Sequence, residues 1–230
     1  MTALAEAADP RWRYGLYNLG ETAKYVGIPS RTMANWGRGT SAGAPPLITT
    51  FPPGEGERGV LVPFIGFAEA YALNALRRAG LSMQRIRPDV EKIKAEIGLE
   101  HALASQNLAT DGVEVLFKYA GDDPDHTVVR TKQRQFRKAV EEYLRPISYG
   151  TDGFARRIQL AVFERAEVFV DPNRAFGHPL LASGKARVED IADRFAAGEA
   201  IAEIAADFRI SVEEVEDVIR VEGFATRRTA

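Results

Sequence analysis

The chain has 230 residues, of which 45% are hydrophobic and 27% are charged, a composition typical of a folded soluble protein of one or two domains. Its formal net charge is −2, so the chain as a whole has no basic excess, and any DNA-binding surface must be local. It contains no cysteine, which excludes disulfides and thiolate chemistry and is compatible with a reducing cytoplasm, where we expect the protein to act.

Residues 1–16 are predicted to form a flexible arm without a signal-peptide pattern, and no apolar run along the chain is long enough to span a membrane. A helix-turn-helix follows. Asn18 and Glu21 can form a capping box at the start of its first helix, and Gly27 ends that helix. The small residue where the helices cross, the turn residue and the inner apolar residues of the second helix are Ala23, Gly27, Met33 and Trp36.

The second helix of this motif begins near Ser30 and carries short hydrogen-bond donors and cations on its outer face. Such side chains suit phosphates and base edges, so this helix is the candidate for contacting DNA. The next stretch is rich in proline and glycine, and "PGEGERG" between two β-branched runs predicts a hairpin tip. The predicted DNA-contacting residues are Ser30, Arg31, Thr32, Asn35 and Arg38, together with Arg58 at the hairpin tip.

Helical spacing of apolar residues then predicts a helix over Phe64–Arg78 and another over residues 82–98. The middle region, residues 101–167, is a candidate for dimerisation. It is predicted to contain a helix from Gln133 to Leu144, and "VEVLFKY", "IQLAVF" and "EVFV" read as strands. Three short helices follow, at Val188 to Ala197, Ala200 to Phe208 and Ser211 to about Glu222.

The last two helices repeat the spacing of the first motif, with Ala205, Val215 and Val218 in the inner roles and Ser211 with Glu214 as a capping box. Arg209 stands where the first motif has its glycine, which suggests a different turn. The outer face of the second helix carries Glu213, Glu214, Glu216 and Asp217 against Arg220. Because a phosphate backbone would repel these carboxylates, the second motif is expected to hold a protein rather than DNA.

Two stretches resemble known families. The helix-turn-helix, the hairpin, the following helix and the segment "RRAGLSMQRIR" stand in the order of a MerR-type winged helix, although that family commonly has arginine where this chain has Ala34. The tail carries "DP…FG-P", "VEDIADRFAAGE" and "IA-DF-IS-EEVE". It resembles the C-terminal module of VapB-type antitoxins that have a MerR-like front end, with "GKAR" where that family usually has "GTR".

The resemblance implies an antitoxin that binds and neutralises a PIN-domain ribonuclease toxin encoded next to it and represses its own operon. It assigns DNA binding to residues 17–100 and toxin binding to the module over residues 168–230. Since one recognition helix covers only a half-site, we expect a homodimer on a palindromic operator. The candidate toxin-binding residues are Glu213, Glu214, Glu216, Asp217, Arg220, Arg227 and Arg228, the last two for pairing with carboxylates of the toxin.

The expected fold is mainly α (α+β): an N-terminal winged helix-turn-helix, a small β-containing middle region and a C-terminal three-helix module. No constellation of acid, base, nucleophile or metal ligands can be assembled, so the sequence predicts no enzyme activity, no metal and no cofactor. Two alternatives stay open. A stand-alone MerR-like repressor would sense a small molecule in its middle region, whereas a structural adaptor would hold proteins with both modules.

Overall fold

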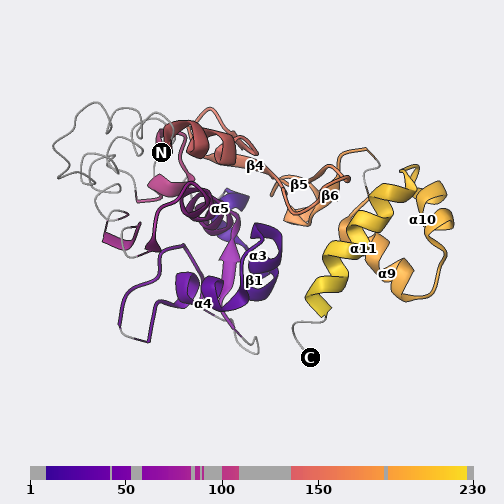
Figure 1. Cartoon of the computed structure of the whole chain (residues 1–230), viewed down its shortest axis with the longest axis horizontal. Coiled ribbons are helices and arrows are strands. Elements are labelled where there is room, and N and C mark those ends of the chain that lie inside the picture. Colours follow the sequence, from indigo (N-terminus) through magenta and orange to yellow (C-terminus); the bar gives the residue numbers. More distant parts are fainter. Residues whose placement is uncertain are drawn as a thin grey trace.

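The computed structural model describes residues 9–41, 43–52, 59–83, 86–88, 90, 100–108, 136–183 and 186–226. These residues form a mixed structure of helices and small sheets, as the sequence predicts. In Figure 1 the three C-terminal helices gather at one end of the long axis, and β5 and β6 lie between them and the rest of the chain. No helix within the described residues has both the length and the apolarity that crossing a bilayer requires.

From Asp9 onward the amino-terminal segment packs against the fold, which corrects the second half of the flexible arm predicted over residues 1–16, whereas residues 1–8 lie outside the described residues. Asp9 caps α2 (Pro10–Arg13), and β1 (Gly15–Asn18) follows. The buried guanidinium of Arg11 pairs with Asp9 and with Asp152, which lies far along the chain. An ion pair between distant residues leaves no periodic trace in a sequence, so the pattern of the arm gave no sign of it.

The predicted helix-turn-helix is confirmed as α3 (Leu19–Val26) and α4 (Ser30–Arg38). Asn18 forms the capping box with Glu21, in which the two backbone N–H groups donate over 2.9 and 2.8 Å. Gly27 ends α3 with φ of 76°, a left-handed conformation that suits glycine.

The base of the predicted hairpin is also present. Phe51 and Leu61 exchange two backbone hydrogen bonds of 2.8 and 3.1 Å as an isolated antiparallel bridge. The tip of the hairpin, with Arg58, lies outside the described residues. β2 (Leu61–Pro63) pairs antiparallel with β1, and β1 was not predicted. β2 leads into α5 (Phe64–Arg78), whose bounds match the prediction.

The middle region supplies a helical segment over residues 136–144 and the first two strands of an antiparallel sheet, which the C-terminal stretch completes. The strands of this sheet follow in chain order as β3 (Ile147–Tyr149), β4 (Ala155–Gln159), β5 (Val168–Val170) and β6 (Leu180–Leu181). The predicted strand "EVFV" is confirmed in β5, whereas "IQLAVF" is strand only up to Gln159 because the chain turns there. "VEVLFKY" lies outside the described residues. Short 3-10 turns occur as η1 (Ala102–Ala104) and η3 (Ala175–Gly177).

The three C-terminal helices are confirmed as α9 (Val188–Ala196), α10 (Ile201–Phe208) and α11 (Val212–Thr226). The same stretch of chain also supplies β5 and β6, and β5 pairs with β4 of the middle region. One cluster of buried apolar side chains extends from the first helix-turn-helix through the sheet to the C-terminal helices. The predicted module is therefore built into the sheet rather than attached as a separate bundle.

Candidate DNA-binding surface and the acidic module

The outer face of α4 is open to solvent. Met33 and Trp36 point inward and are 0% and 1% exposed. The predicted DNA-contacting side chains lie on the other side, with Ser30, Arg31, Asn35 and Arg38 exposed and Thr32 half-buried. Neither Arg31 nor Arg38 forms an ion pair within the described part of the chain, so both guanidiniums are available to phosphates or base edges.

Two arginines that the sequence did not single out support α4 from behind. Arg87 donates hydrogen bonds to the backbone carbonyls of Asn35, over 3.2 Å, and of Pro45, over 2.8 Å. The guanidinium of Arg77 lies over the Trp36 ring at 5.8 Å from its centre. Both arginines belong to the segment "RRAGLSMQRIR", but a run of cations does not reveal which of its members turn toward the protein.

The turns of the two helix-turn-helix motifs have the same backbone geometry. After α3, Gly27 is left-handed and the N–H of Ile28 donates to the carbonyl of Ala23 over 2.9 Å. After α10, Arg209 is left-handed with φ of 54°, and the N–H of Ile210 donates to the carbonyl of Ala205 over 3.0 Å. The different turn predicted from Arg209 is therefore wrong. The second motif keeps the geometry of the first, although a left-handed arginine is less favourable than a left-handed glycine.

Asp217 is not part of an exposed acidic face, which corrects the prediction for this residue. It is 4% exposed, and one carboxylate oxygen accepts the backbone N–H groups of Arg165 and Ala166 over 2.7 and 3.0 Å. Burial opposes ionisation, but these hydrogen bonds and the one from Arg220 hold the pKa of Asp217 below its usual range. The carboxylate therefore fixes α11 against the connection between β4 and β5.

Two more of the predicted toxin-binding side chains are also engaged within the chain. Arg220 donates to the backbone carbonyl of Val162 over 2.9 Å, in the same connection that Asp217 holds. Glu214 accepts the hydroxyl of Ser183 over 2.7 Å and the backbone N–H of Ser211 over 2.9 Å, which confirms the capping box. The outer face of α11, which the sequence assigned to toxin binding, is therefore largely occupied by contacts within the chain.

Glu222, which the prediction did not include, reaches the first helix-turn-helix. Its carboxylate pairs with the Lys24 ammonium at 2.6 Å and accepts the hydroxyl of Tyr25 over 3.2 Å. Burial and the nearby Glu222 carboxylate raise the pKa of Tyr25. Among the described members of the predicted toxin-binding set, Glu213, Glu216 and Arg220 are exposed, but Arg220 is engaged with Asp217 and Val162. Arg227 and Arg228 lie outside the described residues.

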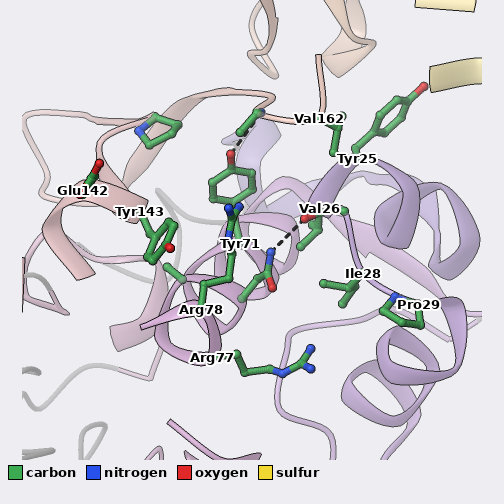
Figure 2. A pocket seen from close by; sticks show the side chains of 15 residues that line it. Tyr25, Val26, Ile28, Pro29, Tyr71, Arg77, Arg78, Glu142, Tyr143 and Val162 are labelled. Atoms are coloured by element: carbon green, nitrogen blue, oxygen red, sulfur yellow. Dashed lines mark hydrogen bonds between the residues drawn. The ribbon is translucent and has the colours of Figure 1, made fainter. Parts of the chain in front are cut away.

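A hollow of about 620 Å³ opens where the first helix-turn-helix, α5 and the middle region meet (Figure 2). The hydroxyl of Tyr71 donates to the carbonyl of Gln159 over 3.2 Å on one side of it. One turn further along α5, the amide of Asn74 donates to the carbonyl of Val26 over 3.0 Å, just before the turn that leads into α4. The wall of the hollow thus includes the segment that sets the direction of α4.

Arg78, at the end of α5, lies beside Tyr143 in the wall of the hollow (Figure 2). The Arg78 guanidinium lies 4.6 Å from the centre of the Tyr143 ring, and it forms no ion pair within the described residues. Val162 also lines the hollow, and its carbonyl accepts the hydrogen bond from Arg220. Parts of the chain that contact α4 and α11 therefore face the same space.

Comparisons with known proteins match both ends of the chain. Residues 15–90 match a family model described as "Putative DNA-binding HTH domain", and residues 168–220 match "Protein of unknown function (DUF433)". A Mycobacterium tuberculosis protein named "Putative antitoxin VapB45" is 39% identical over 227 residues, which cover 91% of this chain and 94% of that protein. The chain belongs to the VapB45 family.

Another relative and a solved structure come from the same organism. The "Uncharacterized protein Rv2308" is 26% identical over 216 residues, covering 89% of this chain and 88% of that protein. The crystal structure of Rv2018 superposes with a TM-score of 0.74 at 35% identity, covering 91% of this chain and 99% of that chain. Membership of the VapB45 family therefore extends over the whole architecture, including the middle region that neither family model matches.

Proposed function

We propose that this chain is a cytoplasmic antitoxin that neutralises a PIN-domain ribonuclease encoded next to it and represses its own operon as a homodimer. The relationship to the protein named an antitoxin and the match to a DNA-binding domain support the two halves of this proposal. The MerR-like winged arrangement is supported by the hairpin base beside the helix-turn-helix. No catalytic step by this chain is needed for either half.

The observation that carries the DNA-binding half is the contrast between α4 and α11. Counted from Ala23 and Ala205, Arg31 matches Glu213 and Asn35 matches Asp217. Arg31 and Asn35 are exposed on a free helix face, where they can reach phosphates and base edges. At the matched positions α11 carries carboxylates, one of them buried against the chain's own backbone.

The test is operator binding by the full chain at fixed salt. The double variant Arg31→Ala with Asn35→Ala should lose about 1–3 kcal/mol of binding free energy for each base contact removed. The matched control is Glu213→Ala with Glu216→Ala on α11, which should bind operator DNA as the unmodified chain does. Unchanged affinity in the first variant would assign DNA binding to another surface.

The toxin-binding half is best tested by substitution in the full chain. A truncation at residue 168 would remove β5 and β6 from the sheet, so it would disturb more than a docking surface. Glu213→Lys with Glu216→Lys reverses the exposed charge of α11 and leaves the internal contacts of Asp217 intact. Weaker co-purification with the adjacent gene product, with unchanged operator binding, would support toxin contact at this face.

A repressor that senses a small molecule is the second candidate, and the hollow beside the turn before α4 favours it. Arg78 and Tyr143 there would suit an anionic ligand with an aromatic ring. A metabolite that releases the full chain from operator DNA, and fails to do so in Arg78→Ala, would establish this reading. If no such metabolite releases the chain from operator DNA and the chain binds the toxin, the antitoxin proposal stands and the second candidate is excluded.

A further inference from the structure

Phe176 is the most exposed large apolar side chain in the described part of the molecule, at 89%. The other three, Tyr14, Phe195 and Val212, are 52%, 41% and 40% exposed. Phe176 belongs to the "DP…FG-P" stretch of the C-terminal module, which the contacts of α11 do not use. An aromatic ring left almost wholly in water brings no stability to the isolated chain.

The backbone beneath the ring is held in an uncommon conformation. Ala175, Phe176 and Gly177 have φ values of 47°, 53° and 81°, so three successive residues are left-handed and two of them carry a side chain. That conformation is unfavourable for a residue with a Cβ. Residues in sparsely populated conformations persist only where the surroundings determine them, and they cluster at binding sites.

The surroundings here do determine the turn. The hydroxyl of Tyr17 donates a buried hydrogen bond to the carbonyl of Gly177. A Cβ on Gly177 would come within 2.7 Å of the Leu16 side chain, so β1 packs directly against the turn. The N–H of His178 donates to the carbonyl of Ala175 over 3.0 Å. The ring is thus presented on a rigid support that faces away from the core.

Arg174, the residue before the turn, and Arg157 of β4 are cations that contact the same aromatic ring. The guanidiniums of Arg157 and Arg174 both lie over the ring of Phe169, at 3.7 and 5.1 Å from its centre. Neither forms an ion pair within the described residues. The ring of Phe176 is therefore flanked in the chain by the cation Arg174 on one side and by His178, which lies 3.7 Å from the Glu189 carboxylate, on the other. An apolar pocket with carboxylates at the part of its rim that faces Arg174 would be complementary to it.

We infer that Phe176 is the aromatic anchor with which this chain holds its protein partner. The inference rests on the proposed function, since the partner is the toxin encoded next to the chain. The ring enters an apolar pocket of that protein, and Arg174 faces carboxylates at the rim. A second copy of this chain is the competing occupant, and loss of the homodimer in Phe176→Gly with toxin binding retained would overturn the inference in its favour.

The test is Phe176→Gly in the full chain, co-expressed with the product of the adjacent gene. Glycine accepts the left-handed backbone, so the melting temperature should stay the same or rise while the partner's Kd rises at least tenfold. Phe195→Ala is the matched control, since it removes another exposed ring from the same module and should leave the Kd unchanged. Arg174→Glu should weaken partner binding more at low salt than at high salt.

The outcomes separate the two proposals. Partner binding that is unchanged in Phe176→Gly overturns the inference and leaves the proposed function standing. A marked fall in melting temperature assigns Phe176 a structural role and also overturns it. Loss of operator binding with the partner retained places the ring on DNA and overturns it as well. If the unmodified chain binds no adjacent gene product, the proposed function fails together with the inference.

Discussion

The two helix-turn-helix motifs of this chain share a backbone and differ in what covers their second helix. Both first helices end in a left-handed residue, Gly27 or Arg209, followed by the same hydrogen bond to the small residue at the helix crossing. In α4 the face opposite the core is free. In α11 the equivalent face lies against the connection between β4 and β5.

The comparison teaches that the shape of the motif does not decide its use. Asn35 and Asp217 occupy the same position, and one is exposed whereas the other is 4% exposed. A carboxylate at this position cannot approach a phosphate, but it is a strong acceptor for two backbone N–H groups. Acidic residues on the second motif are thus explained mainly by contacts within the chain, and only Glu213 and Glu216 are left for a partner.

The largest effect is expected from a substitution on the inner face of α11, which packs as the inner face of α4 does. Val215 is 0% exposed and matches Met33 of the first motif, so Val215→Asp buries an unpaired carboxylate. We expect a loss of about 4 kcal/mol or more in the free energy of unfolding. Limited proteolysis should then cut within residues 186–226. Val212→Asp, at a position 40% exposed in the same helix, should retain normal protease resistance.

The next largest effect is expected from the removal of the Asp217 carboxylate, which tests its hydrogen bonds within the chain. Asp217→Ala leaves the backbone N–H groups of Arg165 and Ala166 without an acceptor, which should cost about 1–3 kcal/mol of unfolding free energy in urea titrations. Glu216→Ala, on the exposed neighbouring residue, should change it by less than about 0.5 kcal/mol. Equal effects of the two substitutions would contradict the docking role.

The same residue predicts a pH dependence. Because the pKa of Asp217 is lowered in the folded chain, its contribution is fully present above the ordinary carboxyl pKa of about 4 and is lost as pH falls through the lowered value. The difference in stability between the unmodified chain and Asp217→Asn should therefore be constant near neutral pH and shrink below about pH 4. A difference that grows on acidification would contradict this sign.

A smaller effect is expected at the contact between the two motifs. Lys24 of α3 and Glu222 of α11 form an ion pair at 2.6 Å whose side chains are 16% and 22% exposed. A double-mutant cycle with Lys24→Met and Glu222→Gln should give a coupling energy of about 0.5–1 kcal/mol. The glutamine keeps an acceptor for the hydroxyl of Tyr25, so the cycle reports mainly the charge pair. A coupling near zero would show that this pair does not link the two motifs.

The helices could be predicted because their signals are local. The capping boxes at Asn18 and Ser211, and the helical spacing behind α5, placed the predicted helix ends within a few residues of those in the structure. β1, β3 and β6 were missed because strands of four, three and two residues are too short to show alternation. Their pairing partners lie on distant or equally short segments.

The site was harder to predict than the fold. An exposed residue such as Arg31 and a buried one such as Asp217 have the same pattern in sequence, that of a polar residue on the outer face of a helix. Which of them stays outside depends on where the connection between β4 and β5 passes, and that is a tertiary property. The exposure of Phe176 is a similar case, since phenylalanine is usually buried and nothing local in the sequence marks this one as exposed.

The smallest predicted effect concerns the shared turn itself. Arg209 is left-handed and exposed, and a left-handed residue with a Cβ costs about 1–2 kcal/mol. Arg209→Gly removes that cost but gives the unfolded chain more freedom, which offsets about 0.5–1 kcal/mol, so we expect a net gain of about 0.5–1 kcal/mol. The converse change, Gly27→Ala, should destabilise, because it places a Cβ at φ of 76° and 3.1 Å from the Val162 side chain. Thermal unfolding of both variants measures the difference. If Arg209→Gly stabilises the chain and leaves operator and partner binding unchanged, only the conformation of the turn matters at this position. If it destabilises the chain, the arginine side chain contributes a contact of its own.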